Sequence, residues 1–136
     1  MFARNPCVER GCSACCHDTQ MPLTDEDVAR LVALGHALDA FSVVDDEGWR
    51  RLRTVEPSTP GAPRPCFFLR DGLCGVYEAR PEGCRIYPFV ATPEGRMVRD
   101  EDCPFRREFV APPGTARRLG RVVSRLESQA ASRRLL

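Results

Sequence analysis

The sequence contains no lysine, and all 20 of its basic residues are arginine. A Schiff-base lysine and the lysine of a phosphate-binding P-loop are therefore excluded from any mechanism. No apolar stretch approaches the ~18 residues that a membrane-spanning helix needs, so no membrane span is expected. The N-terminal residues lack the apolar core of a secretory signal, and on this basis we expect a cytoplasmic protein.

The sequence also has almost no net charge, because its basic and acidic residues nearly balance and leave only +1 over 136 residues. At ~100–200 residues per domain, the chain is long enough for one main domain. The charges are unevenly spread, since residues 106–136 carry eight arginines against two glutamates. We therefore divide the chain into a cysteine-rich domain, residues 1–110, and a basic C-terminal helix, residues 111–136.

The basic helix has three interpretations: it packs on the cysteine domain, it compensates that domain's negative charge, or it binds an acidic partner. Aromatic residues are absent after Phe109, so base stacking on this helix is not expected. We therefore expect no nucleic-acid partner.

Cysteine is what the sequence has in abundance. In reducing cytosol disulfides are rare, and clustered cysteines more often bind metal. Thiolates suit soft or borderline centres, so the expected cofactor is an iron–sulfur cluster, with [4Fe–4S] as first candidate, or zinc. Eight thiolates suffice for two four-ligand sites, or for one site with spare thiols, and the spacing leaves both open. The candidate metal ligands are Cys7, Cys12, Cys15, Cys16, Cys66, Cys74, Cys84 and Cys103.

The N-terminal cysteines have the spacing C-x4-C-x2-C-C. Cys12 and Cys15 form a CxxC knuckle whose short loop lets both sulfurs reach one centre. Cys15 and Cys16 are adjacent, so their side chains diverge toward two sites or toward two corners of one cluster. His17 could replace a thiolate, but eight cysteines make this unnecessary, and we expect His17 not to be a ligand.

Residues 1–22 are expected to form a loop, and the helix signals are strongest after residue 22 and near the C-terminus. Thr24 and Asp27 predict a capping box at the start of a helix that runs to about residue 40. Gly35, on the apolar face of that helix, is expected to permit close packing. A short helical turn is predicted around Trp49, and a final amphipathic helix is predicted over residues 115–132.

Two hairpins are predicted between these helices. In the first, residues 66–77, we favour a three-residue loop, residues 70–72, because a two-residue turn would place Cys66 and Cys74 on opposite faces. Cys84 is expected in a single turn that opens at Pro81 and ends at Gly83. The second hairpin is centred on residues 94–95. The expected fold class is a small, metal-stabilised α+β cysteine-cluster domain with few helices, short hairpins and much irregular loop.

The cysteine clusters and their neighbours resemble those of the YkgJ-type cysteine-cluster family, described as a zinc- or iron-chelating domain and related to a domain of flagellin lysine methylases. The resemblance spans residues 7–104, with its most specific part at residues 80–88, Arg-Pro-x2-Cys-Arg-x2-Pro. It implies a cytoplasmic protein whose eight cysteines bind metal. One departure is the gap between Cys7 and Cys12, which is longer than the family pattern.

These observations give a leading function and an alternative. We expect an iron–sulfur protein that acts in electron transfer or assists a group transfer such as protein methylation, with a redox or methyl-transfer protein as partner. The alternative is a zinc-binding interaction module without catalytic activity. No carboxylate pair, Ser-His-Asp set or glycine-rich phosphate loop indicates a self-contained enzyme, and the sequence leaves open whether the chain is one.

Overall fold

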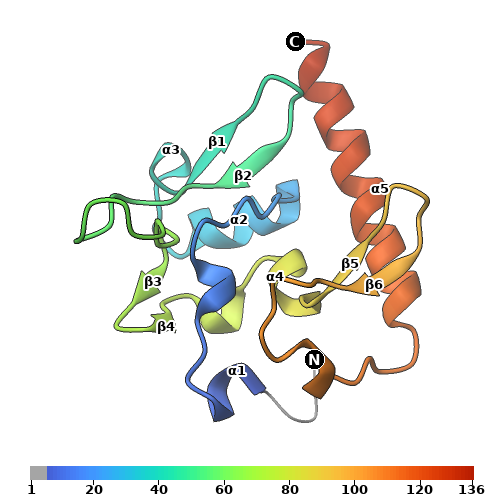
Figure 1. The fold of residues 1–136 in the computed structure, drawn as a ribbon. Helices are drawn as coiled ribbons and strands as arrows, with labels where there is room; N and C mark the ends of the chain where they lie inside the picture. The colour runs from blue at the N-terminus through green and yellow to red at the C-terminus, as the bar shows by residue number, and fades with distance from the viewer. Residues whose placement is uncertain (1–5) are drawn as a thin grey trace.

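The computed structural model describes residues 6–136 as five α-helices, three 3-10 helices and three two-stranded antiparallel sheets, linked by irregular chain (Figure 1). This arrangement confirms the expected α+β class. The helices are α1 (Pro6–Glu9), η1 (Ala14–Cys16), α2 (Asp25–Ala33), α3 (Leu38–Phe41), η2 (Tyr77–Ala79), α4 (Glu82–Ile86), η3 (Arg106–Glu108) and α5 (Thr115–Arg134). The hairpins pair β1 (Ser42–Val44) with β2 (Arg50–Leu52), β3 (Leu69–Arg70) with β4 (Leu73–Cys74), and β5 (Phe89–Ala91) with β6 (Met97–Arg99).

Helix α2 begins at the predicted capping box. The Thr24 side chain accepts a hydrogen bond from the Asp27 amide, and the Asp27 carboxylate accepts one from the Thr24 amide, both at 3.0 Å. The helix ends at Ala33, so the prediction that it reaches residue 40 is wrong. Gly35 has a φ of +98°, and this left-handed conformation ends helices. Beyond the two adjacent residues, no atom lies within 4 Å of where a Cβ of Gly35 would be, so its role is to end the helix and not to allow close packing.

The buried residues form two hydrophobic cores. The first core joins α2, α3 and the β1–β2 hairpin to the segment that carries Cys66 and Phe68. The second core lies between α5 and the chain from α4 to η3. The first contains Leu23, Leu31, Phe41, Leu52, Cys66, Phe68 and Val76. The second contains Ile86, Phe89, Cys103, Phe109, Leu119, Val122 and Leu126.

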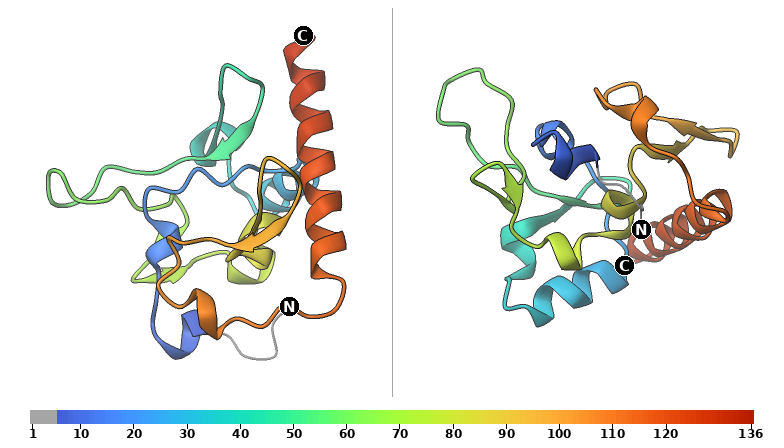
Figure 2. Two further views of the ribbon diagram at one scale, coloured as in Figure 1. Left: turned by 45° about the vertical axis from the view of Figure 1, so that its right-hand side comes forward. Right: turned by 90° about the horizontal axis from the view of Figure 1, so that it is seen from below.

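Helix α5 covers the predicted residues 115–132 and extends to Arg134. It runs along one side of the molecule and packs on α4 and β5 (Figures 1 and 2). Arg118 pairs with Glu82 of α4 at 2.6 Å, and Arg133 pairs with Asp25 of α2 at the same distance. The helix arginines therefore contact acidic side chains of the cysteine-rich part of the chain.

The β3–β4 hairpin has a register that differs from the predicted one. Leu69 pairs with Cys74 and Arg70 with Leu73, so the turn has two residues and not three. Asp71 and Gly72 both have positive φ, at 50° and 77°, which is typical of the primed turns that suit two-residue hairpins. The positive φ at Asp71 was not foreseen, because only glycine adopts it at no steric cost.

Three smaller predictions are also wrong. The chain around Trp49 is the end of the β1–β2 turn, where Asp45 accepts hydrogen bonds from the Trp49 and Glu47 amides, and it forms no helical turn. Cys84 lies within α4, and Gly83 is inside this helix instead of ending it. The N-terminal segment, expected to be a loop, contains α1 and η1.

Residues 1–5 of the predicted cysteine-rich domain lie outside the described residues. The hairpin at residues 94–95 forms as predicted.

No helix in residues 6–136 has both the length and the apolar composition of a transmembrane segment.

Candidate metal centre

Seven of the eight cysteines line a single cavity with a volume of about 350 Å³. They come from three separate parts of the chain: the N-terminal segment, the β3–β4 region and α4. The seven are Cys7, Cys12, Cys15, Cys16, Cys66, Cys74 and Cys84. Cys103 is buried in the second core, against which Cys7 also packs. All eight are free thiols.

The N-terminal segment delivers four of these cysteines. The Cys12 amide donates a hydrogen bond of 2.8 Å to the Cys7 carbonyl oxygen, which folds the longer gap between the two into a compact turn. Gly11, with a φ of +60°, closes this turn. The gap therefore does not remove Cys7 from the cavity. Cys15 and Cys16 follow in η1, and Cys15 alone among the eight cysteines is exposed.

Cys66 and Cys74 reach the same cavity despite the two-residue hairpin turn. The reason is that Cys66 is not part of the β3 ladder. The Leu69 amide donates to the Cys66 carbonyl oxygen at 2.9 Å, so the chain turns just before β3 begins. The assumption that the alternation of the strand extends back to Cys66 was the error in the predicted register.

Cys84 is positioned by helix α4, whose N-terminal end is anchored on α2. The Glu82 amide donates a 3.0 Å hydrogen bond to the Asp27 carboxylate, which is 1% exposed. Gly83 lies against Met21, since a Cβ at this position would stand 2.3 Å from the Met21 sulfur. The capping carboxylate of α2 therefore also fixes the element that carries Cys84.

Neighbouring thiols shift one another's pKa values. A hydrogen bond from the Cys16 thiol lowers the pKa of Cys15 to about 7, whereas the same bond and burial raise the pKa of Cys16. Burial, followed by the nearby thiols, raises the pKa of Cys7 to about 11. Burial also raises the pKa of Cys66, Cys74, Cys84 and Cys103, with further increases from neighbouring cysteines.

Arg80 places a cation on the wall of the cavity. Its guanidinium lies 3.9 Å from the centre of the Tyr77 ring, and its Nε donates to the Tyr77 carbonyl oxygen at 2.9 Å. The charge of Arg80 lowers the pKa of Cys7, Cys15, Cys74 and Cys84, although burial outweighs it in Cys7, Cys74 and Cys84. Arg80 therefore favours the thiolate form of cysteines on several sides of the cavity.

The other arginines next to cysteines in the sequence have partners elsewhere. Arg10 pairs with Glu108 and Arg64 with Glu56. Arg70, Arg85 and Arg106 donate to backbone carbonyl oxygens. Of the six arginines that flank cysteines in the sequence, Arg80 is the one that lines the cavity.

His17 is not among the residues that line the cavity. Its Nδ1 lies 3.0 Å from the Ser13 carbonyl oxygen, and its backbone bridges to Pro65. That His17 is not a ligand stays a prediction.

The remaining walls are largely apolar, and they include four residues that were not identified from the sequence: Val8, Leu73, Tyr77 and Tyr87. Val8 and Leu73, which are 59% and 63% exposed, line the cavity from the surface side. Tyr77 and Tyr87 contribute aromatic rings. Burial and a hydrogen bond with Asp100 raise the pKa of Tyr87. The Arg-Pro-x2-Cys-Arg-x2-Pro string contains Tyr87, but no spacing rule indicated that its ring would face the cysteines.

Within residues 6–136, no three His, Cys, Asp or Glu side chains are gathered closely enough to hold one metal ion as they stand. The cysteines line a cavity and are not preassembled as a coordination sphere for one ion. The donor set is nevertheless chemically uniform, because every candidate ligand on the cavity wall is a thiol. Thiols fit zinc or iron–sulfur centres and do not fit magnesium or calcium.

Comparison with known proteins matches most of the chain to a family model. No curated protein and no solved structure matches the chain. A family model described as "CxxCxxCC: Putative zinc- or iron-chelating domain" matches residues 6–104, a range that contains all eight cysteines and ends just before η3. The chain therefore belongs to the CxxCxxCC family of zinc- or iron-chelating domains.

Proposed function

We propose that this metal-binding domain is an iron–sulfur protein whose cysteine-lined cavity holds the cluster. The observation that carries the proposal is that seven thiols from three separate parts of the chain line one cavity of about 350 Å³. A space of this size, with thiols on several walls, suits a centre of several atoms. The family description is compatible with iron.

The surrounding residues supply what such a centre needs. The cysteine thiolates would hold it, with Cys66 inside the first core and Cys16, Cys74 and Cys84 packed against that core. Arg80 offsets part of the negative charge that thiolates bring into the cavity. Leu52, Phe68, Val76 and Phe109 line the same space and exclude water from its inner wall.

The proposed role is electron transfer or assistance to a group transfer such as methylation. A bound iron–sulfur cluster would supply one-electron chemistry whose potential depends on charge, hydrogen bonds and exposure around the sulfurs. The exposed Cys15 and the apolar side chains of Val8 and Leu73 mark the side on which a redox or methyl-transfer partner would approach. A cytoplasmic location is part of this proposal, because thiols stay reduced there.

The second candidate is a zinc-binding interaction module without catalytic activity. It is favoured by the family description, which names zinc beside iron. Here the thiolates would serve stability alone, as in other structural zinc sites.

The visible spectrum of anaerobically purified protein separates the two. An iron–sulfur protein is brown, with a broad absorption that dithionite bleaches. A colourless preparation with stoichiometric zinc would replace the proposed function by the zinc alternative.

A further inference from the structure

We propose that the eight cysteines form two four-thiolate centres that lie side by side. The first group is Cys16, Cys66, Cys74 and Cys84, and the second group is Cys7, Cys12, Cys15 and Cys103. This division rests on the proposed function, in that the cavity holds metal, and it adds which thiols share a centre.

Core packing separates the cysteines in this way. All four members of the first group belong to the first hydrophobic core: Cys66 is part of it, and Cys16, Cys74 and Cys84 pack against it. Cys103 is part of the second core, and Cys7 packs against it. No cysteine belongs to both cores, and Cys12 and Cys15 belong to neither.

Backbone hydrogen bonds connect cysteines within each group. The Cys66 amide donates to the Cys16 carbonyl oxygen at 2.6 Å, although 50 residues separate the two in the sequence. In the second group, the Cys12 amide donates to the Cys7 carbonyl oxygen at 2.8 Å. These two bonds hold Cys16 to the first group and Cys12 to the second.

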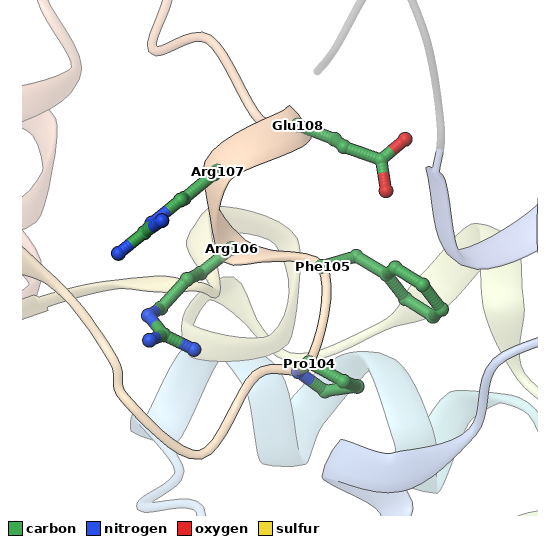
Figure 3. Close-up of a pocket in the computed structure, with 5 residues that line it drawn as sticks. All are labelled: Pro104, Phe105, Arg106, Arg107 and Glu108. Carbon is green, nitrogen blue, oxygen red and sulfur yellow. The ribbon is translucent and has the colours of Figure 1, made fainter.

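The segment that follows Cys103 is docked on the N-terminal segment through Arg10. Arg10 pairs with Glu108 at 2.9 Å and lies 5.3 Å from the centre of the Phe105 ring. Phe105 and Glu108 point to one side of this segment, and Arg106 and Arg107 point to the other (Figure 3). The contacts of Arg10 therefore bring the chain next to Cys103 to the turn that contains Cys7 and Cys12.

Apart from Cys15, the cysteines that act on one another's pKa belong to the same group. After burial, the groups that raise the pKa of Cys7 are Cys15, Cys12 and Cys103, all of the second group. The cysteines that raise the pKa of Cys103 are Cys15 and Cys12. In the first group, Cys66 and Cys74 both raise the pKa of Cys84, after the larger effect of Cys15.

Cys15 lies at the boundary, because it also acts on Cys16, Cys66, Cys74 and Cys84. The first group already has four members without Cys15, and both four-thiolate zinc sites and cubane clusters are complete at four. Cys15 therefore completes the second group. The adjacent residues Cys15 and Cys16 then belong to different centres, and the hydrogen bond between their thiols lies where the two centres adjoin.

Arg80 acts on both groups. Its charge lowers the pKa of Cys7 and Cys15 in the second group and of Cys74 and Cys84 in the first. A single cation thus offsets part of the negative charge of two neighbouring thiolate centres.

The metal content of the purified full chain tests the division with four variants. Cys74→Ser and Cys12→Ser should each retain about half of the wild-type metal, because each removes a ligand from one of the two centres and that centre then loses its metal. Cys7→Ser/Cys12→Ser, confined to the second group, should also retain half. Cys12→Ser/Cys74→Ser, one change in each group, should retain almost none. His17→Ala, which changes the residue next to Cys16, serves as the control and should keep the full metal content.

The division is overturned if Cys74→Ser and Cys12→Ser each lose all metal, or if the combination across the groups keeps as much as either single variant. Wild-type protein without metal would instead refute the proposed function itself.

A second measurement needs no variant. After a limiting amount of chelator removes about half of the metal from wild-type protein, thiol alkylation followed by peptide mass spectrometry identifies the protected cysteines. The division predicts molecules with four adducts, all on one group. Adducts distributed over both groups within single molecules would overturn it.

Discussion

The backbone amide of Cys66 lies 2.6 Å from the carbonyl oxygen of Cys16, to which it donates a hydrogen bond. This bond holds the N-terminal segment that carries Cys16 against Cys66, a buried residue of the first core. His17 and Pro65, the next residue on each side, form an antiparallel bridge. The cysteine cavity is therefore a tertiary feature that depends on the packing around it.

Asp27 should be among the most sensitive residues outside the cysteines. Its carboxylate accepts hydrogen bonds from the Thr24 and Glu82 amides and pairs with Arg30. Asp27→Ala removes these partners from a site that is 1% exposed and should lower the free energy of unfolding by about 2–4 kcal/mol. Chemical denaturation measures this. The exposed Asp46 provides the matched control, and an Asp46→Ala variant as unstable as Asp27→Ala would contradict the explanation.

Gly48 and Gly120 provide a matched pair that tests the docking of the β1–β2 turn on α5. Gly48 has a φ of +87°, and a Cβ there would stand 2.4 Å from the Ala130 carbonyl oxygen. Gly48→Ala should therefore lower the melting temperature, with a loss of more than about 1 kcal/mol. Gly120→Ala lies inside α5, where the new Cβ meets no atom within 4 Å outside the backbone of the helix itself, and it should stabilise by up to about 1 kcal/mol. Equal effects of both substitutions would argue against this packing.

The pKa of Cys15 predicts a pH-dependent reactivity in metal-free protein kept cold. Because the pKa is lowered from 9.0 to about 7, the thiolate forms as pH rises through 7. Alkylation of Cys15 should accelerate between pH 6 and 8, whereas Cys7, with a pKa of about 11, should remain slow. Peptide mass spectrometry after short exposure distinguishes the two sites.

The lowered pKa of Cys15 also makes the stability of the folded protein depend on pH. A thiol with a lowered folded-state pKa contributes stability that is complete above its unfolded value of 9.0 and is lost as pH falls through about 7. Removing the Cys16 thiol by Cys16→Ala removes the hydrogen bond that is the largest cause of the shift. The half-point for Cys15 alkylation should then move to higher pH; an unchanged half-point would contradict this cause.

Metal removal should destabilise the cavity before it destabilises α5. The cysteines pack against both cores, but the apolar stripe of α5 has its own contacts with Ile86 and Phe89. Loss of metal should therefore lower the melting temperature and broaden the transition while helical circular dichroism persists at low temperature. A metal-free chain that melts as high and as sharply as the metallated one would show that the metal is peripheral to the fold.

Local signals in the sequence predicted several elements correctly. The Thr24–Asp27 capping box, the hairpin at residues 94–95 and the final helix each depend on neighbouring residues, and each forms. The end of α2 was misplaced because a helical spacing of apolar residues continues past Gly35, whose left-handed backbone stops the helix. A period of apolar residues does not reveal where a glycine leaves the helical region.

The arrangement of the cavity could be predicted only in part. Eight cysteines indicated a metal centre, but their grouping depends on contacts between distant segments, such as Arg10 with Glu108 and Glu82 with Asp27. The β3–β4 register was also decided outside the strand, by the turn that begins at Cys66. The role of Arg80 at the cavity depends on its stacking on Tyr77. None of these relationships has a signature in the spacing of residues.

X-ray absorption at the metal edge of anaerobically purified wild-type protein tests most directly whether the cysteine thiolates hold an iron–sulfur centre. The account predicts an iron edge with a first shell of sulfur alone and a second shell of iron at short distance. Zinc surrounded by four sulfurs at about 2.3 Å would keep the thiolate site but replace the cluster. A first shell of nitrogen or oxygen around either metal would contradict the central claim that these cysteines bind it.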